Sequence, residues 1–480
     1  MTISIALLLA CIGESVDDST STTDTEQSSD DTGTGDTGNK DTGSSDTGTE
    51  DTGVEDTGVK DTGAPPEPLE RFSGDYELLA APGRIRGVRG EVTVGRYAAA
   101  GGENQYGVNT FWLNAPTTGA VYAFEQGLSG EHTAEAADLG LERPEGPGDG
   151  YFGLDAEGGL DVTGNGHADL VVAAPSYGGI TTVTLFEGPV SASSEPIATV
   201  SEPAGDFYSE VTVLQAAQPQ VVMTSGTGLA VFLFDQPSGA LEPSDHDAIL
   251  TGPVSPSMDV DRAGDLNGDG LDDLLVTSLD RVYVVMGPVA GSQLLDDSDA
   301  VLVADPTSTL VKANGVGAGD VDGDGLADIL VGTPYSADGQ GGAGLFVGQV
   351  SGTLSVSSAD VLLEYSGSGE ANLGYSADAA GDVDADGHGD LILGAPNYVD
   401  VDGGGEAFLW YGPLSSGVYK SGDADARFYS AAGGAGFGTL VLGLGDISGD
   451  GGSDLLIGAP LHLNAGESGY GSGMIGVWSL

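Results

Sequence analysis

The chain has 480 residues, of which 74 are acidic and 13 basic, and its formal net charge is -61. That charge excludes a nucleic-acid-binding protein, because phosphates would be repelled, and it suits a protein that collects divalent cations. Glycine is abundant, with 82 residues, and charged residues make up only 18% of the chain. The length allows two or three ordinary domains or one large repeat fold, and the long Leu/Ala/Glu/Lys patterns of helical proteins are missing.

The N-terminus carries an apolar run over residues 2–10, followed directly by Cys11, the only cysteine. This arrangement resembles a bacterial lipobox, and the run is too short to span a bilayer. The resemblance implies a lipid-anchored protein of the bacterial outer membrane or cell surface. The alternative is an ordinary secretory signal and a secreted protein. No Lys or Arg precedes the run, which departs from a signal peptide and raises the question of a start upstream of Met1.

Residues 12–70 form a polar, low-complexity segment in which Asp-Thr-Gly recurs every five residues, seven times between Asp31 and Gly63. Nothing in it can bury a core, so we expect a disordered, self-repelling linker. Asp-Thr-Gly is also the signature of aspartic proteases, but there it lies in a packed turn between apolar strands. We therefore divide the chain into a signal segment (1–11), a linker (12–70) and a folded domain (71–480).

The folded domain contains five nine-residue loops with oxygen-bearing side chains at positions 1, 3, 5 and 9 and glycine at position 6. They begin at Asp161, Asp265, Asp320, Asp382 and Asp446. Around them, short β-branched runs alternate with Gly, Pro and Asp, which indicates an all-β protein.

The units share one layout. A short strand, often ending in Phe-Gly, is expected before the loop, and an apolar strand after it. A Gly-Ala-Pro-like corner follows, with the proline 14 residues after the first aspartate in four units; Leu279 replaces it in the unit that begins at Asp265. A third apolar strand comes next, in seven copies: residues 119–124, 181–186, 229–234, 281–286, 343–347, 406–411 and 474–478.

Two of the seven units lack a good loop. In the first, residues 102–110 keep Gly107 but have no carboxylate at positions 1, 5 or 9, and in the third the loop is replaced by residues 215–220. Seven units of this size predict a seven-bladed β-propeller, with an open solenoid as the alternative. The last unit ends at its third strand, so a fourth strand is expected from residues 76–88.

These Phe-Gly, Asp-x-Asp-x-Asp-Gly-x-x-Asp and Gly-Ala-Pro elements resemble the FG-GAP repeats of the integrin alpha-subunit propeller and of many secreted bacterial proteins. The resemblance covers roughly residues 75–480. It implies seven blades, calcium in loops between the first and second strands on one face, and a role in adhesion or ligand binding.

Calcium prefers six to eight oxygen ligands, and the loops offer them. Position 7 would contribute a backbone carbonyl, and position 9 a carboxylate. The expected ligands are Asp161, Thr163, Asn165, His167 and Asp169; Asp265, Asn267, Asp269, Leu271 and Asp273; Asp320, Asp322, Asp324, Leu326 and Asp328; Asp382, Asp384, Asp386, His388 and Asp390; and Asp446, Ser448, Asp450, Gly452 and Asp454.

An EF-hand is excluded, because its loop needs a glutamate at position 12. In every loop here, position 12 is an apolar residue of the following strand. We expect about five structural Ca²⁺ sites. The loops at Asp320 and Asp382 have four side-chain carboxylates, those at Asp265 and Asp446 three, and the one at Asp161 two, so affinity should fall in that order.

No catalytic residues are predicted. The five histidines show no nucleophile or metal-ligand spacing. Ser244, Asp245 and His246 are consecutive, but a catalytic triad is defined by its arrangement in space and not by adjacency in sequence, so we interpret them as a polar loop. The sequence therefore favours a non-enzymatic, monomeric module that binds a protein or glycan and touches the membrane only through its lipid. The alternatives are a hydrolase or lyase acting at the propeller channel and a purely structural envelope protein.

Overall fold

The computed structural model describes residues 71–87, 98–103, 109–115, 119–125, 128–144, 151–176, 179–203, 209–225, 230–252, 258–304, 313–397, 403–463 and 473–479. All of them belong to a compact unit spanning Pro68–Leu480. The predictions for Cys11 and for the linker lie outside the described residues.

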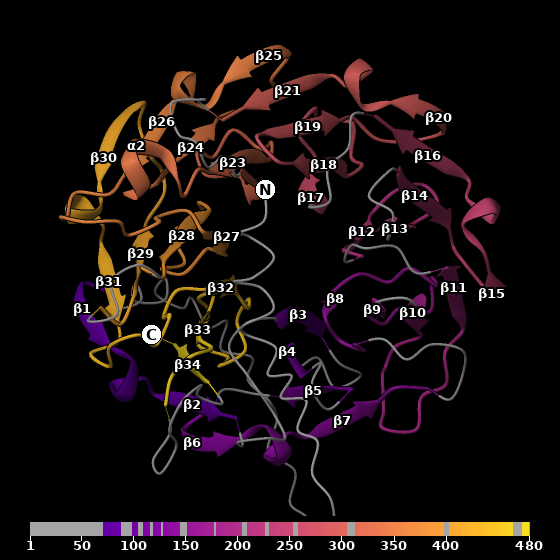
Figure 1. The fold of residues 1–480 in the computed structure, drawn as a ribbon, viewed down its shortest axis with the longest axis horizontal. Coiled ribbons are helices and arrows are strands. Elements are labelled where there is room, and N and C mark those ends of the chain that lie inside the picture. Colours follow the sequence, from indigo (N-terminus) through magenta and orange to yellow (C-terminus); the bar gives the residue numbers. More distant parts are fainter. Residues whose placement is uncertain are drawn as a thin grey trace, which may run out of the picture. The chain divides into compact units, whose positions relative to one another are not determined.

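Seven mostly antiparallel sheets are arranged as blades around a ring (Figure 1). Their innermost strands, β3, β8, β12, β17, β22, β27 and β32, contact one another in this order, and β32 contacts β3. The predicted seven-bladed propeller is confirmed, and the open solenoid is wrong.

The strands of each blade are given from the ring axis outward. Blade 1 has β3 (Ala98–Glu103), β4 (Asn109–Ala115), β5 (Ala120–Glu125) and β7 (Leu139–Glu142); blade 2 has β8 (Asp155–Glu157), β9 (Leu170–Ala174), β10 (Ile180–Phe186), β11 (Ala198–Pro203) and β15 (Gly239–Leu241); blade 3 has β12 (Val211–Leu214), β13 (Gln220–Thr224), β14 (Ala230–Asp235), β16 (Ala248–Thr251) and β20 (Gly291–Leu294). Blade 4 has β17 (Met258–Gly264), β18 (Asp273–Ser278), β19 (Arg281–Val285), β21 (Ala300–Val303) and β25 (Gly352–Ser355); blade 5 has β22 (Asn314–Gly319), β23 (Asp328–Gly332), β24 (Gly342–Phe346), β26 (Val361–Glu364) and β30 (Gly417–Lys420). Blade 6 has β27 (Ser376–Gly381), β28 (Asp390–Ala395), β29 (Glu406–Trp410), β31 (Ala426–Tyr429) and β1 (Gly74–Glu77); blade 7 has β32 (Leu440–Gly443), β33 (Leu455–Ala459), β34 (Met474–Trp478), β2 (Gly83–Arg86) and β6 (Gly130–Thr133).

The ring closes between the two ends of the folded domain. Strand β2 pairs antiparallel with β34, with Gly83 opposite Val477 and Arg86 opposite Met474. This is the fourth strand expected from residues 76–88. Closure joins segments far apart in the chain, so blade 7 can form only when both are present.

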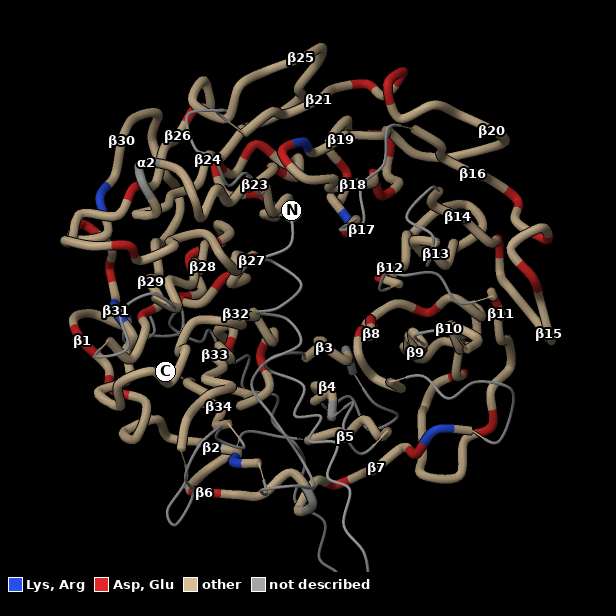
Figure 2. Tube along the Cα trace, in the orientation of Figure 1, with Lys and Arg blue, Asp and Glu red and all other residues tan. Residues whose placement is uncertain are grey.

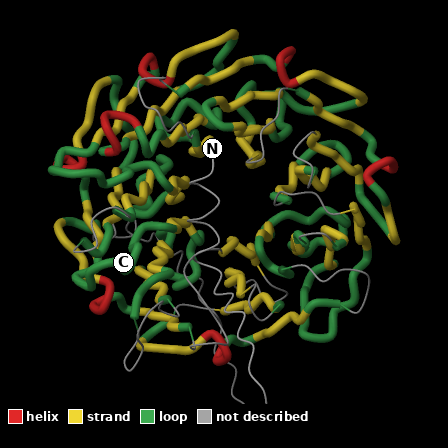
Figure 3. The backbone as a smooth tube through the Cα atoms, viewed as in Figure 1, coloured by secondary structure: helices red, strands yellow, loops and turns green. Residues whose placement is uncertain are grey.

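A fifth strand was not predicted. In six blades the outermost strand comes from the next blade and runs parallel to the fourth strand, as β30 does beside β26. Each leads into a 3-10 helix, and these helical turns lie along the rim (Figure 3): η1 (Leu78–Ala80), η2 (Ala134–Ala136), η3 (Pro243–Asp245), η4 (Leu295–Asp297), η5 (Val356–Ser358) and η6 (Ser421–Asp423). The short helix α2 spans Ser336–Gly339. Neighbouring blades are thereby linked at the rim as well as at the axis.

The predicted position of the Phe-Gly pairs is wrong, because they precede the first strand instead of ending it. Phe437 is fully buried, and Gly438 has φ +83 and donates its N–H to Gly458 O at 2.9 Å. A Cβ on Gly438 would lie 2.1 Å from Glu406 O in the previous blade. The phenylalanine is therefore an inter-blade anchor, and the glycine permits the tight turn into β32.

The core lies between the blades. At the closure, the buried Trp478 of blade 7 packs edge-on against Phe428 of blade 6 and against Phe437, with ring centroids 5.1 and 6.0 Å apart. Burying large aromatic side chains is a major source of stability in such interfaces. The apolar third strands that the sequence revealed thus supply both faces of every blade.

Candidate metal centre

The five loops all connect the first strand of a blade to the second, as the resemblance implied. In each, the first aspartate accepts the N–H of the position-6 glycine, at 2.7 to 3.0 Å, from Gly166, Gly270, Gly325, Gly387 and Gly451. These glycines have φ between +84 and +100, a region that L-residues with side chains disfavour. The loop backbone is thus wrapped around the first carboxylate, which fixes its orientation.

The position-9 aspartates are buried at the start of the second strand and are held from both sides. In the third loop, Asp328 accepts the Val321 N–H at 3.0 Å on Oδ2 and the Gly348 N–H at 2.9 Å on Oδ1. The same pattern holds in the second and fourth loops, where Gly287 and Gly412 donate. Each carboxylate oxygen retains a lone pair for a further partner.

Enclosure makes these carboxylates costly to ionise. Burial raises the pKa of Asp273, Asp328 and Asp454 to about 6 and that of Asp390 to about 7, and it also raises the pKa of Asp169. Neighbouring loop carboxylates add to the effect at Asp328, where Asp322 and Asp324 repel a second negative charge. A cation in the loop would relieve this cost.

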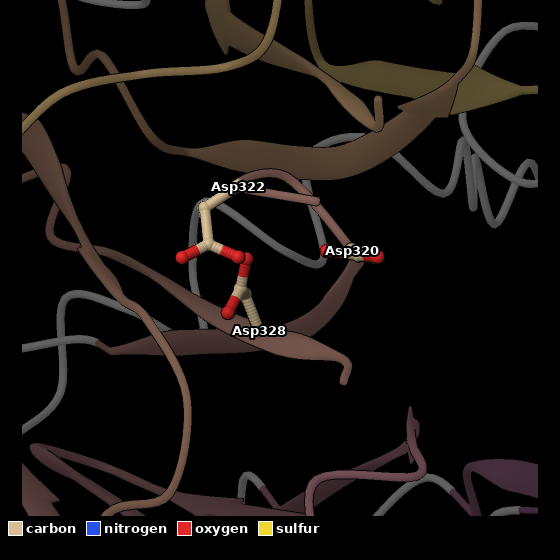
Figure 4. Close-up of side chains that lie close together, drawn as sticks. All are labelled: Asp320, Asp322 and Asp328. Atoms are coloured by element: carbon tan, nitrogen blue, oxygen red, sulfur yellow. The ribbon is translucent and has the colours of Figure 1, made fainter. Parts of the chain in front are cut away.

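Two loops bring three carboxylates to one point. In the third loop, one oxygen each of Asp320, Asp322 and Asp328 lie within 4.8 Å of one another, with Asp322 and Asp328 facing each other (Figure 4). In the fourth loop, Asp382, Asp384 and Asp390 do the same. Such oxygen-only clusters are the donor set that Ca²⁺ prefers.

The fit to a cation is supported by buried oxygens that accept no hydrogen bond from the described residues. These are Oδ1 of Asp384, Oδ2 of Asp450 and Oδ1 of Asp454. Buried acceptors normally find a donor or an ion. The third, fourth and fifth loops therefore suit a metal by geometry as well as by residue type.

Some of the remaining predicted ligands already accept hydrogen bonds from the backbone of their own loop. The position-5 side chains Asn165, Asp269, Asp324, Asp386 and Asp450 each accept the N–H of position 7, at 2.8 to 3.0 Å, through Oδ1. That leaves Oδ2 of Asp269, Asp324 and Asp450 for a metal, whereas Oδ2 of Asp386 also accepts a hydrogen bond from Arg71 at 3.0 Å. In the first loop, Asn165 also donates from Nδ2 to Gly188 O at 2.7 Å.

Neighbouring loops are joined into a belt. In three of the five loops, the position-8 N–H donates to the position-1 carbonyl of the loop before it: Ala327 to Asp265, Gly389 to Asp320 and Ser453 to Asp382, at 2.8 to 2.9 Å. Asp272 continues the belt to Gln215 in blade 3, whose turn replaces the loop as predicted. Because one bond repeats from blade to blade, these loops lie on the same face of the ring. In blade 1, part of residues 102–110 lies outside the described residues.

One residue of the fourth loop's surroundings escaped sequence reasoning. Arg71, which lies just before β1, places Nε 2.5 Å from Asp384 Oδ2 and a terminal nitrogen 3.0 Å from Asp386 Oδ2. Its guanidinium also lies 5.1 Å from the centre of the Tyr411 ring. A guanidinium therefore stands beside the carboxylates of this loop, and more than 300 residues of intervening sequence hid the pairing.

A second group of acids lies on the innermost strands, away from the loops. Asp155, Asp261 and Asp378 accept N–H groups of the next blade's innermost strand, from Val211, Gly317 and Gly443, at 2.7 to 2.9 Å. Burial raises the pKa of Asp155 and Asp261 to about 7 and that of Asp378 and of nearby Glu157 to about 8. Perturbed carboxyls can mark active sites, but these bonds identify three of them as ties between blades.

The triad-like letters are also structural. Asp245 accepts the Glu242 N–H at 2.8 Å, and Nδ1 of His246 lies 2.7 Å from Pro243 O, so both residues cap the short helix η3. No helix in the described part of the chain is long and apolar enough to cross a membrane.

Comparison with known proteins agrees with the repeat pattern. The model of the FG-GAP-like repeat matches residues 265–331, which contain the second and third loops. Integrin alpha-5 of Xenopus laevis is 32% identical over 149 residues, covering 28% of this chain and 14% of the integrin. Integrin alpha-IIb of Mus musculus is 34% identical over 146 residues, covering 27% and 14%.

Among solved structures, that of BBS1N in complex with ARL6DN is similar, with a TM-score of 0.41 and 10% identity over 81% of this chain and 93% of that one. The sequence matches thus span a small part of the integrin subunits. They confirm the predicted resemblance to FG-GAP repeats and to the integrin alpha propeller.

Proposed function

We propose that this FG-GAP β-propeller is a calcium-stabilised, non-enzymatic module that binds a protein or glycan outside the cell. In this proposal Cys11 carries a lipid that anchors the chain to a bacterial outer membrane, and residues 12–70 serve as the linker. The observation that supports calcium binding is the clustering of three carboxylate oxygens in each of two loops. In both loops the backbone already curves around the first aspartate.

The role of the bound ion would be structural. Calcium would neutralise carboxylates that the fold crowds together, while the loop residues themselves hold the turn and join the blades. Since the position-8 bonds link adjacent loops, ordering one loop supports the next. Bound calcium would thereby explain how a strongly acidic ring is stable without disulfides, since Cys11 is the only cysteine.

The alternative of a hydrolase acting at the ring axis receives no support from the described residues. The carboxylates there bond to backbone N–H groups of neighbouring blades, which explains their positions without a substrate. A panel of hydrolase and lyase substrates tests this alternative, and turnover abolished by Asp378→Asn would favour it.

Calorimetric titration of the EDTA-treated full chain with CaCl₂ tests the calcium proposal. We expect about five sites, one fewer in Asp328→Asn, and no loss in Asp296→Asn, which alters an exposed carboxylate outside the loops. Each loop filled at millimolar calcium should add about 1–2 kcal/mol to the free energy of unfolding. A melting temperature that EDTA leaves unchanged would contradict the proposal.

The binding role is tested by pull-down from cell-surface extracts, with and without calcium. Partners retained only with calcium would support a binding module. A chain that retains nothing under either condition would favour the purely structural envelope protein.

A further inference from the structure

The outer edge of blade 1 differs from the other six. Those blades end in a fifth, parallel strand, whereas the sheet of blade 1 has the order β3-β4-β5-β7. Among the described residues, β7 (Leu139–Glu142) therefore pairs only with β5. Figure 1 shows β7 at the rim between β6 and the loop that follows β10.

The reason lies in the connection between the third and fourth strands of blade 2, which would have to supply the missing strand. Its flanking paired residues, Leu185 and Ala198, are 13 positions apart, against 15 for Leu233 and Ala248 in blade 3 and 17 for Leu409 and Ala426 in blade 6. Residues 187–197 are all described and contain no strand. They form a serine turn closed by the Ser194 N–H on Ser191 O at 2.9 Å.

The same connection, residues 187–197, also places no fully buried apolar side chain between blades 1 and 2. After the fifth strand, three of the other connections insert a large buried apolar side chain between blades, namely Leu78, Leu295 and Val356. Between blades 1 and 2 the connection contributes Val190, which is only partly buried, and Leu139 of β7 is partly buried as well. A strand edge that pairs with none of the described residues thus borders partly buried apolar side chains.

The six internal fifth strands show what fits such an edge. Each begins with a glycine at positive φ or in extended backbone: Gly74, Gly130, Gly239, Gly291, Gly352 and Gly417. In five of them this glycine donates its N–H to the carbonyl just before the fourth strand, at 2.7 to 3.2 Å. Main-chain bonds therefore provide the attachment, as in β-strand addition between proteins.

Side chains of opposite charge also pair between the fourth and fifth strands. The last residue of β26, Glu364, lies opposite Lys420 of β30, and the two form an ion pair. Asp75 on Arg427, at 3.4 Å, and Glu131 on Arg86, at 3.1 Å, are further pairs between a fifth strand and a fourth strand. Strand β7 ends in the exposed Glu142, which occupies the position of Glu364.

We propose that β7 is a docking edge for an extended segment of a partner protein with the pattern Gly-x-x-Lys or Gly-x-x-Arg. The segment adds as the fifth strand of blade 1, parallel to β7, and its basic residue pairs with Glu142. The surrounding charge favours a basic partner, because residues 67–480 contain 59 acidic and 11 basic residues. Acidic residues recur around the rim (Figure 2), so a second copy of this chain would be repelled.

This inference names a partner chemistry for the proposed binding module but does not depend on which loops hold calcium. It is tested on the full chain in saturating calcium with a fluorescent peptide that copies residues 415–424, the chain's own β30 segment. A second peptide replaces its lysine by glutamate. Charge reversal in the protein, Glu142→Lys, completes a swap, and the exposure of Glu142 makes that variant compatible with folding.

The wild-type chain should bind the lysine peptide about three- to tenfold more tightly than the glutamate peptide, as expected when a surface ion pair is exchanged for repulsion. Glu142→Lys should reverse the preference. Amide hydrogen exchange of Gly140 and Glu142 should slow on binding, and N-methylation of the peptide glycine should weaken it.

Three results would overturn the proposal: no binding of the lysine peptide, equal preferences in wild type and Glu142→Lys, or a dimer in sedimentation that Glu142→Lys changes. The last would assign the edge to a second copy. If the peptide fails while calcium still titrates into the loops, the docking edge is wrong and the calcium-stabilised module stands.

Discussion

Arg71 should weaken calcium binding at the fourth loop, so that Arg71→Gln strengthens it. The third and fourth loops each have four side-chain carboxylates, yet among the described residues only the fourth has a guanidinium beside them, 2.5 Å from Asp384 and 3.0 Å from Asp386. The ion must displace this charge or share the site with it. The order of affinities expected from carboxylate number alone would then fail for these two loops.

The size of the effect follows from exposure. The Arg71 side chain is 52% exposed while that of Asp384 is 0% exposed, so the pair is stronger than a surface ion pair but still screened. An interaction of about 1–2 kcal/mol is reasonable for such a contact. Removing the guanidinium should therefore tighten calcium binding at this loop by about five- to thirtyfold.

Calorimetry on four proteins measures this: wild type, Arg71→Gln, Asp384→Asn and the double variant. If Arg71 acts through the fourth loop, its substitution strengthens binding in the wild-type background and has a smaller effect once Asp384 is neutral, when only the contact with Asp386 remains. Arg86→Gln is the matched control, since Arg86 pairs with Glu131 at 3.1 Å and not with a loop. An equal gain from Arg71→Gln in both backgrounds would refute the reasoning.

Three further outcomes are expected. Because the folded-state pKa of Asp378 is raised from 3.8 to about 8, its contribution to stability is complete below pH 4 and is lost as pH rises toward 8; urea unfolding in saturating calcium should show this decline, and Asp378→Asn should flatten it by about 3 kcal/mol if half of the shift is realised. Phe437→Ala should cost about 3–5 kcal/mol in the same assay, because a fully buried inter-blade ring is lost; a cost below 1 kcal/mol would argue against its role as an anchor. Gly438→Ala should destabilise far more than Gly130→Ala, since both have similar φ (+83 and +80) but only Gly438 meets a neighbouring carbonyl at 2.1 Å; equal losses in thermal melts would show that backbone strain alone matters.

Local pattern was enough to identify the blades. The seven apolar third strands, the five Asp-rich loops and the borrowed strand near residue 83 could all be read from the sequence, because each depends on residues close together in the chain or on counting repeats. The Phe-Gly pairs were misplaced by one element. A phenylalanine beside a glycine is compatible with either end of a strand, and only packing against the previous blade decides which end it marks.

In the candidate site, too, local features could be predicted from the sequence and long-range contacts could not. The loop backbone follows from glycine positions and carboxylate spacing, so the meeting of the carboxylates at positions 1, 3 and 9 in the third and fourth loops could be expected from the chain alone. The contact between Arg71 and Asp384, the belt of position-8 bonds and the ties of Asp155, Asp261 and Asp378 could not. The belt and the ties join groups on different blades, and Arg71 lies more than 300 residues from Asp384, so none of these contacts gives a periodic signal in the sequence.

The sequence by itself determined the number of blades, the places of the loops and the acidity of the ring, because repeated short-range patterns encode strands, turns and carboxylate spacing. Only the tertiary structure decided which blade lacks a fifth strand and which loop has an arginine at its side. Both depend on how the two ends of the domain and the connections between blades meet in space. A connection two to four residues shorter than its equivalents leaves β7 uncovered, and that difference acquires meaning only beside the six edges that are filled.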